Sequence, residues 1–98
     1  MPLFQKIYEH YPSIPDLPYF IGSCLLNETK FDLALTYFSK ALDLDPAYDR
    51  NIYIYMAVCA KALGKIKEAK RILNEALQKY PRFEEAHFYK AKMHLKSN

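Results

Sequence analysis

The 98-residue sequence contains only two glycines, two cysteines and no tryptophan. Two glycines are too few for a glycine-rich phosphate-binding loop in addition to ordinary turns, which argues against most nucleotide-using enzymes. No apolar run approaches the roughly 18 to 20 residues that a membrane-spanning helix needs, so we expect no membrane span. The N-terminus lacks the basic stretch and the long apolar core of a signal peptide, so we expect a cytoplasmic, intracellular protein.

Charge is unevenly distributed along this chain, which is half hydrophobic and has the length of one small globular domain or of a fragment. Residues 1–49 contain 3 Lys and Arg against 7 Asp and Glu, a net charge of −4, whereas residues 50–98 contain 11 against 4, a net charge of +7. The basic half indicates an acidic partner, which could be a protein segment, a nucleic-acid backbone or a membrane surface. The alternative is that the lysines are solvated positions on helix faces.

Prolines recur at a nearly constant interval. Pro12, Pro46 and Pro81 lie 34 and 35 residues apart, and each follows an amphipathic run. Because proline lacks the backbone N–H and its ring clashes with the preceding helical turn, each of these prolines predicts a helix end at the same phase of a repeat.

The intervening apolar residues follow the three-and-four spacing of a buried helical stripe, and no segment alternates with the period of a strand. The sequence therefore predicts an all-α protein. We expect one helix capped by Asp16, one over 31–44 capped by Thr29 with Asp32, one that Asp49 caps and Gly64 stops, and two more over 66–80 and 83–96.

This helix–turn–helix period resembles the tetratricopeptide repeat. The residues that carry the resemblance are Gly22, Leu25, Ala34, Phe38, Ala41 and Pro46, then Tyr53, Ala57, Ala60, Leu63, Gly64, Ala69, Leu73, Ala76 and Pro81. It implies a right-handed α-solenoid of antiparallel helix pairs, with about two full repeats plus flanking helices. Within a single domain over 1–98, residues 1–14 end a preceding second helix, 15–48 and 49–83 are repeats, and 84–98 form a first helix of a third repeat or a capping helix.

In the tetratricopeptide family the first helices line a concave groove that binds peptides or partner helices. The groove residues that the resemblance implies are Tyr19, Ser23, Asn27, Tyr55, Val58, Lys61, Phe88, Tyr89 and Lys92. We therefore expect a non-catalytic protein–protein interaction module with a protein or peptide ligand, and the basic half favours an acidic one. The aromatic residues could instead pack against neighbouring helices.

Two other classes of function stay open. The chain could be a structural spacer or a self-associating segment of a longer solenoid, in a transport, ciliary or cytoskeletal assembly. Binding of an acidic surface or of nucleic acid by the basic half is a more distant alternative, because the run from Lys65 to Arg71 has no interleaved aromatic residues.

Residues that could support catalysis or metal binding are scattered. Cys24 and Cys59 occupy equivalent repeat positions, about 10 Å apart in stacked helices, which exceeds the roughly 7 Å limit for a disulfide, so we expect them to be packing residues. His87 and His94 could share a helix face, but they fill aromatic positions of the repeat. The sequence thus predicts no enzyme, no metal site and no cofactor.

Overall fold

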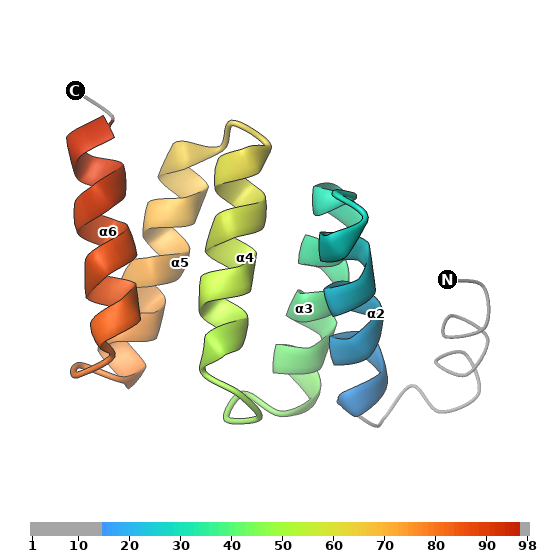
Figure 1. The fold of residues 1–98 in the computed structure, drawn as a ribbon. Coiled ribbons are helices and arrows are strands. Elements are labelled where there is room, and N and C mark those ends of the chain that lie inside the picture. Colours follow the sequence, from blue (N-terminus) through green and yellow to red (C-terminus); the bar gives the residue numbers. More distant parts are fainter. Residues whose placement is uncertain (1–14, 97–98) are drawn as a thin grey trace. The chain divides into compact units, whose positions relative to one another are not determined.

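The computed structural model describes residues 15–96, and every regular element in that range is an α-helix, which confirms the all-α fold class. The helices are α2 (Asp16–Asn27), α3 (Phe31–Leu44), α4 (Asn51–Ala62), α5 (Ile66–Lys79) and α6 (Glu84–Lys96), as Figure 1 shows. The helix expected at 1–14 lies outside the described residues. None of the described helices is both long and apolar enough to cross a bilayer.

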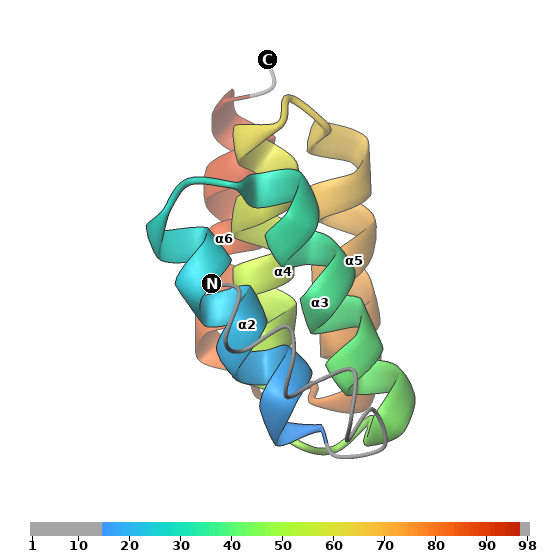
Figure 2. The same cartoon turned by 90° about the vertical axis from the view of Figure 1, so that its right-hand side faces the viewer.

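The helices belong to two compact units, which meet in the sequence between Asp49 and Arg50. Helices α2 and α3 form an antiparallel hairpin in the first unit, which is seen most clearly in Figure 2. In the second unit α4, α5 and α6 follow one another in alternating directions, and α5 packs against both of its neighbours. A regular solenoid stacking of these units stays a prediction.

The core of the first unit depends on a close approach of α2 to α3. Phe38 on α3 is fully buried, and a Cβ atom added to Gly22 on α2 would lie 3.0 Å from two atoms of the Phe38 ring. Any larger side chain at this position would therefore collide with the ring. Glycine is the residue that lets the two helices pack around a phenylalanine.

The second unit has its most amphipathic helix in the middle of its sequence. Helix α5 buries Ala69, Ile72, Leu73 and Ala76, which follow three-and-four spacing, and its remaining residues are mostly charged. Small alanines next to branched aliphatic residues allow α4 and α6 to pack on either side of this stripe. The spacing read from the sequence thus corresponds to the buried face of the helix.

The turn between α2 and α3 is closed by a hydrogen-bond pattern typical of helix C-termini. The backbone N–H of Lys30 donates to the carbonyl of Leu25 at 2.9 Å, and that of Thr29 donates to the carbonyl of Leu26 at 3.0 Å. Thr29 has a φ of 61°, the left-handed conformation that this motif requires. The same two bonds recur 35 residues later, from Lys65 to Ala60 at 2.8 Å and from Gly64 to Lys61 at 2.9 Å.

The side-chain caps predicted at Asp16, Thr29 and Asp49 are wrong. The residues that precede α2 to α5 are Pro15, Lys30, Arg50 and Lys65, and none of them makes a side-chain capping bond. Thr29 belongs to the end of α2, and its hydroxyl donates to the carbonyl of Glu28 at 2.6 Å. Asp49 instead accepts a hydrogen bond from the Tyr19 hydroxyl at 3.4 Å.

Candidate functional site

The α2 residues of the predicted groove differ in their surroundings. Tyr19 is half-buried, and its ring centroid lies 6.1 Å from that of Phe38 and 5.4 Å from that of Tyr48. These contacts make Tyr19 a packing residue of its own hairpin. Ser23 is half-buried and Asn27 is exposed.

The α4 residues of the predicted groove, Tyr55, Val58 and Lys61, are all half-buried and lie on successive turns of the helix. They belong to a different unit from the α2 residues. It therefore stays a prediction that the two sets line one groove.

On α6 the structure brings three of the predicted residues together, and we call them the α6 aromatic patch: Phe88, Tyr89 and Lys92. The ring centroids of Phe88 and Tyr89 are 5.7 Å apart, and the Lys92 ammonium lies 5.9 Å from the centre of the Phe88 ring. Phe88 is 62% exposed, the highest value among the exposed large hydrophobic residues of the described chain. An exposed aromatic ring with a cation beside it is a common anchor in protein interfaces.

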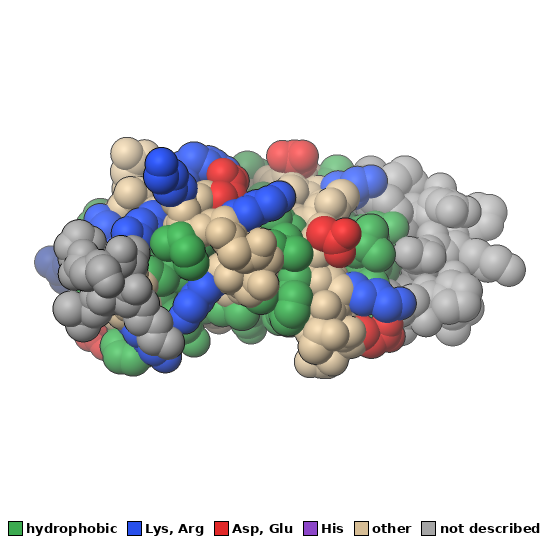
Figure 3. Space-filling model, turned by 90° about the horizontal axis from the view of Figure 1, so that it is seen from above, with side chains coloured by type: hydrophobic (Ala, Val, Ile, Leu, Met, Phe, Trp, Pro, Cys, Tyr) green, Lys and Arg blue, Asp and Glu red, His purple; other side chains and the backbone are tan. Residues whose placement is uncertain are grey.

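Positive charge is prominent on the second unit, where Figure 3 shows blue side chains around green ones over α4–α6. Not all of this charge is available to a ligand. Arg71 is held between Glu68 and Glu75, whose carboxylate lies 3.1 Å away, and these bonds raise the pKa of Arg71 and lower that of Glu68. The basic run that opens α5 is therefore partly neutralised by its own helix.

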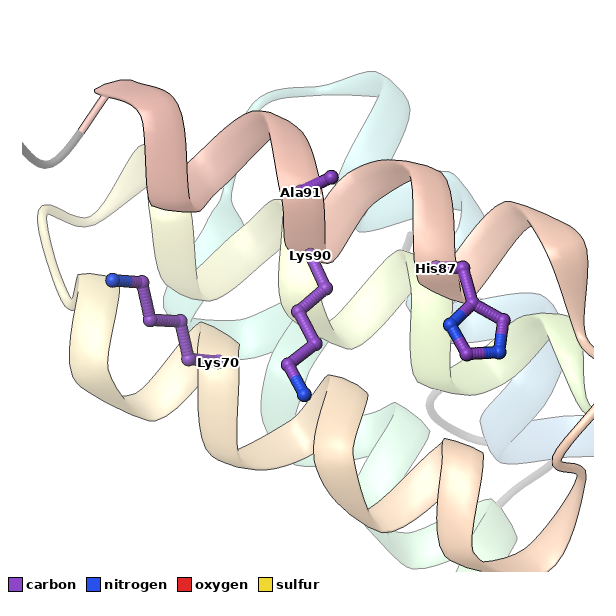
Figure 4. A pocket seen from close by; sticks show the side chains of 4 residues that line it. All are labelled: Lys70, His87, Lys90 and Ala91. Carbon is purple, nitrogen blue, oxygen red and sulfur yellow. The ribbon is translucent and has the colours of Figure 1, made fainter.

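A hollow of about 330 Å³ lies between α5 and α6, and Figure 4 shows the side chains that line it. They are Lys70, His87, Lys90 and Ala91, and Lys90 extends from α6 toward α5 in this view. The Nε2 atom of His87 lies 2.8 Å from the carbonyl oxygen of Pro81 and must donate to it, because a carbonyl only accepts. This bond holds His87 to the turn that precedes α6.

A second hollow, of about 370 Å³, lies at that turn, and we call it the turn hollow. Its lining residues are Arg50, Lys79, Tyr80, Pro81, Arg82 and Phe83. The Arg50 guanidinium lies 4.6 Å from the centre of the Phe83 ring, and the Lys79 ammonium lies 5.9 Å from that of Tyr53. A side-chain hydrogen bond with Tyr53 raises the pKa of Lys79.

Sequence reasoning missed the turn hollow. Arg50 and Arg82 are far apart in the chain, and only the packing of α4 beside α5 brings them to one place. The available signal was that cations flank the Pro81 turn on both sides.

The two cysteines are free thiols in different environments. Cys59 is fully buried, and its desolvation raises the pKa of the thiol to about 11, whereas Cys24 is only half-buried. A thiolate is therefore hard to form at Cys59. Among the residues that the structure describes, no three His, Cys, Asp or Glu side chains are grouped as metal ligands would be.

Comparison with known proteins corrects the expected family. A comparison with curated proteins found no match. The family model that matches is that of Regulator of microtubule dynamics protein 1-3, over residues 21–97, and it is not a tetratricopeptide model. The assignment to the tetratricopeptide family is therefore wrong. Small residues that face bulky ones, such as Gly22 and Phe38, are common in closely packed helical hairpins and do not identify one family. A match over most of the chain places it in the family of Regulator of microtubule dynamics protein 1-3.

Proposed function

We propose that this chain is a non-catalytic protein-interaction module that acts in association with microtubules. The observation that carries this proposal is the family match, whose description names regulators of microtubule dynamics. It is supported by the net charge of +7 on residues 50–98, which suits an acidic protein surface. On this proposal the protein is associated with the cytoskeleton.

Two features of the second unit would contribute to binding in different ways. Exposed cations on α4–α6 would steer the module toward an acidic surface and raise the rate of association. The α6 aromatic patch would then provide apolar contact area, since Phe88 and Tyr89 combine a large ring with little side-chain entropy to lose. The α4 residues of the predicted groove, Tyr55, Val58 and Lys61, belong to the same unit as α6 and would contribute where the partner extends beyond α6.

Co-sedimentation of the purified chain with polymerised microtubules tests the proposal. We expect the chain to pellet at low salt and to be released as salt is added, because screening weakens the attraction between exposed charges. Phe88→Ala should weaken binding by about fivefold or more, as the loss of an interface anchor does. Phe20→Ala is the matched control, because Phe20 is also exposed, at 51%, but lies on α2.

Failure of the folded chain to pellet at any salt concentration would contradict the proposal. Equal losses of microtubule binding for Phe88→Ala and Phe20→Ala would show that the α6 aromatic patch is not the contact surface. If the chain forms larger species as its concentration rises and Phe88→Ala abolishes them, the self-associating spacer is the correct function.

A further inference from the structure

The turn hollow brings together three positively charged side chains. Arg50, Lys79 and Arg82 line it, and none of the described residues that line it is acidic. Within residues 15–96 the structure records no ion pair for any of these three cations, in contrast to Arg71 with its two carboxylate partners. Glu75 lies one helical turn before Lys79, but it pairs with Arg71. Because like charges held around one hollow repel each other, an anion bound there would be stabilised by all three.

Two of these cations are held in place by aromatic rings that are themselves fixed in the core. The Arg50 guanidinium lies over the ring of Phe83, which is 1% exposed, and the Lys79 ammonium lies over that of Tyr53, which is 2% exposed. Cation–π contacts of this kind restrict long and otherwise mobile side chains. Binding of a ligand therefore costs less side-chain conformational entropy here than it would on a surface of freely moving lysines.

The chemistry of the hollow favours carboxylates over nucleic acid. A guanidinium group presents a planar fork of N–H donors that matches a carboxylate, and Arg50 and Arg82 provide two such groups. Binding of single-stranded nucleic acid needs exposed ring faces for base stacking, but Phe83 is 1% exposed and has the Arg50 guanidinium over its ring. The Tyr80 ring packs against Phe83, with a centroid distance of 6.3 Å and an interplanar angle of 85°. The methylene groups of a glutamate chain could contact these aromatic walls.

We propose that the turn hollow is the binding site for an acidic peptide segment, in which Arg50, Lys79 and Arg82 receive at least two neighbouring carboxylates. This inference rests on the proposed function, because it names the chemistry of the partner segment that the interaction module binds. A volume of about 370 Å³ accommodates side chains of an extended segment and is far too small for a folded domain.

A fluorescently labelled hexaglutamate peptide, titrated into the full chain and followed by anisotropy, tests the site directly. The double variant Lys79→Gln/Arg82→Gln should weaken binding by about tenfold or more, because it removes two of the three cations from the hollow. The control is Lys65→Gln/Lys67→Gln, which removes the same charge from exposed positions at the start of α5 and should cost less than about twofold. Circular dichroism establishes that both variants remain helical.

Equal losses for the two double variants would show that only net charge matters, and would overturn the proposal. It would also be overturned if inorganic phosphate, thymidine oligonucleotides or vesicles with anionic phospholipid bound in a manner sensitive to Lys79→Gln/Arg82→Gln while hexaglutamate did not.

The titration and the co-sedimentation experiment separate this site from the function on which it rests. If the chain pellets with microtubules but both double variants bind hexaglutamate alike, the site fails and the function stands. If hexaglutamate binding depends on Lys79 and Arg82 but the chain does not pellet, the site stands and the microtubule function fails.

Discussion

The hairpins α2–α3 and α4–α5 close with the same backbone hydrogen bonds but with different residues at the critical position. In the first turn the left-handed residue is Thr29, with a φ of 61°, and in the second it is Gly64, with a φ of 81°. A β-branched residue adopts this conformation only at an energetic cost, whereas glycine does so freely. The comparison shows that packing of the two helices and the repeated bonds can impose the turn on an unfavourable residue.

The cores of the two hairpins differ in a complementary way. The first combines glycine at position 22 with phenylalanine at position 38. The second has alanine at 57 and leucine at 73, each 35 residues later in the sequence. All four positions are buried. A smaller residue on one helix is thus accompanied by a larger one on the other, so that the two hairpins fill similar volumes with different residues.

The largest effect is expected from Gly22→Ala, which should destabilise the protein by about 1–2 kcal/mol. Overpacking costs about 1–3 kcal/mol, and the higher helix propensity of alanine returns roughly 0.5–1 kcal/mol. The collision is with the rigid and fully buried Phe38 ring, 3.0 Å from the added Cβ. Urea unfolding followed by circular dichroism measures the change.

The residues of the second hairpin indicate a further substitution that should restore stability to this variant. Gly22→Ala/Phe38→Leu gives the first hairpin the residue types of the second, and it should be more stable than the sum of the two single changes predicts. Stabilisation by Gly22→Ala alone, or strict additivity of the two changes, would refute the compensation between these positions.

Substitutions at the left-handed positions of the two turns should have intermediate effects of opposite sign. Gly64→Ala should destabilise by about 1 kcal/mol, since an L-residue at positive φ is strained, although a Cβ there meets no other atom within 4 Å. Thr29→Gly should stabilise by about 0.5 kcal/mol, because relief of strain exceeds the greater freedom of glycine in the unfolded chain. Thermal unfolding of both variants provides the test, and destabilisation by Thr29→Gly would contradict it.

The smallest effect is expected at Tyr48, which lies 35 residues before Phe83 and corresponds to it in the first unit. A hydrogen bond to the Asp16 carboxylate, with burial and nearby negative charges, raises the pKa of Tyr48 to about 12. Because the folded-state pKa is the higher one, this stabilisation is present below the usual pKa of tyrosine, about 10, and is lost as the pH rises toward 12.

The variant Tyr48→Phe should therefore be less stable than the native protein at pH 9, by at most about 1 kcal/mol, and the difference should shrink at higher pH. Urea unfolding at a series of pH values compares the two proteins. A difference that stays constant up to pH 12 would assign the effect to packing alone.

Much of the fold could be predicted from the sequence because the helices carry strong local signals. The bounds of α3 are those expected, since Pro46 and the stripe of Ala34, Phe38 and Ala41 fix both its end and its face. The change in charge after position 49 also falls where one compact unit ends and the next begins. The caps could not be predicted, because whether Thr29 ends one helix or begins the next depends on its φ.

The candidate site was harder to predict than the fold. Phe88 and Tyr89 were named because the resemblance to the tetratricopeptide repeat implied a groove there, and their role in binding stays a prediction. The turn hollow depends on Arg50, whose position over the Phe83 ring is a tertiary contact between residues 33 positions apart in the sequence. Family membership was mistaken because the packing pattern of a hairpin is common to many families.

The recurrence of the turn hydrogen bonds has a consequence for how such a chain can change in evolution. The bonds that close each hairpin are made by the backbone, and the residues that give the second unit its charge, such as Lys65 and Arg82, are exposed. Substitution of exposed residues seldom changes stability by more than about 0.5 kcal/mol. One hairpin can therefore acquire a new surface chemistry while the other keeps its own, with neither change selected against through loss of folding.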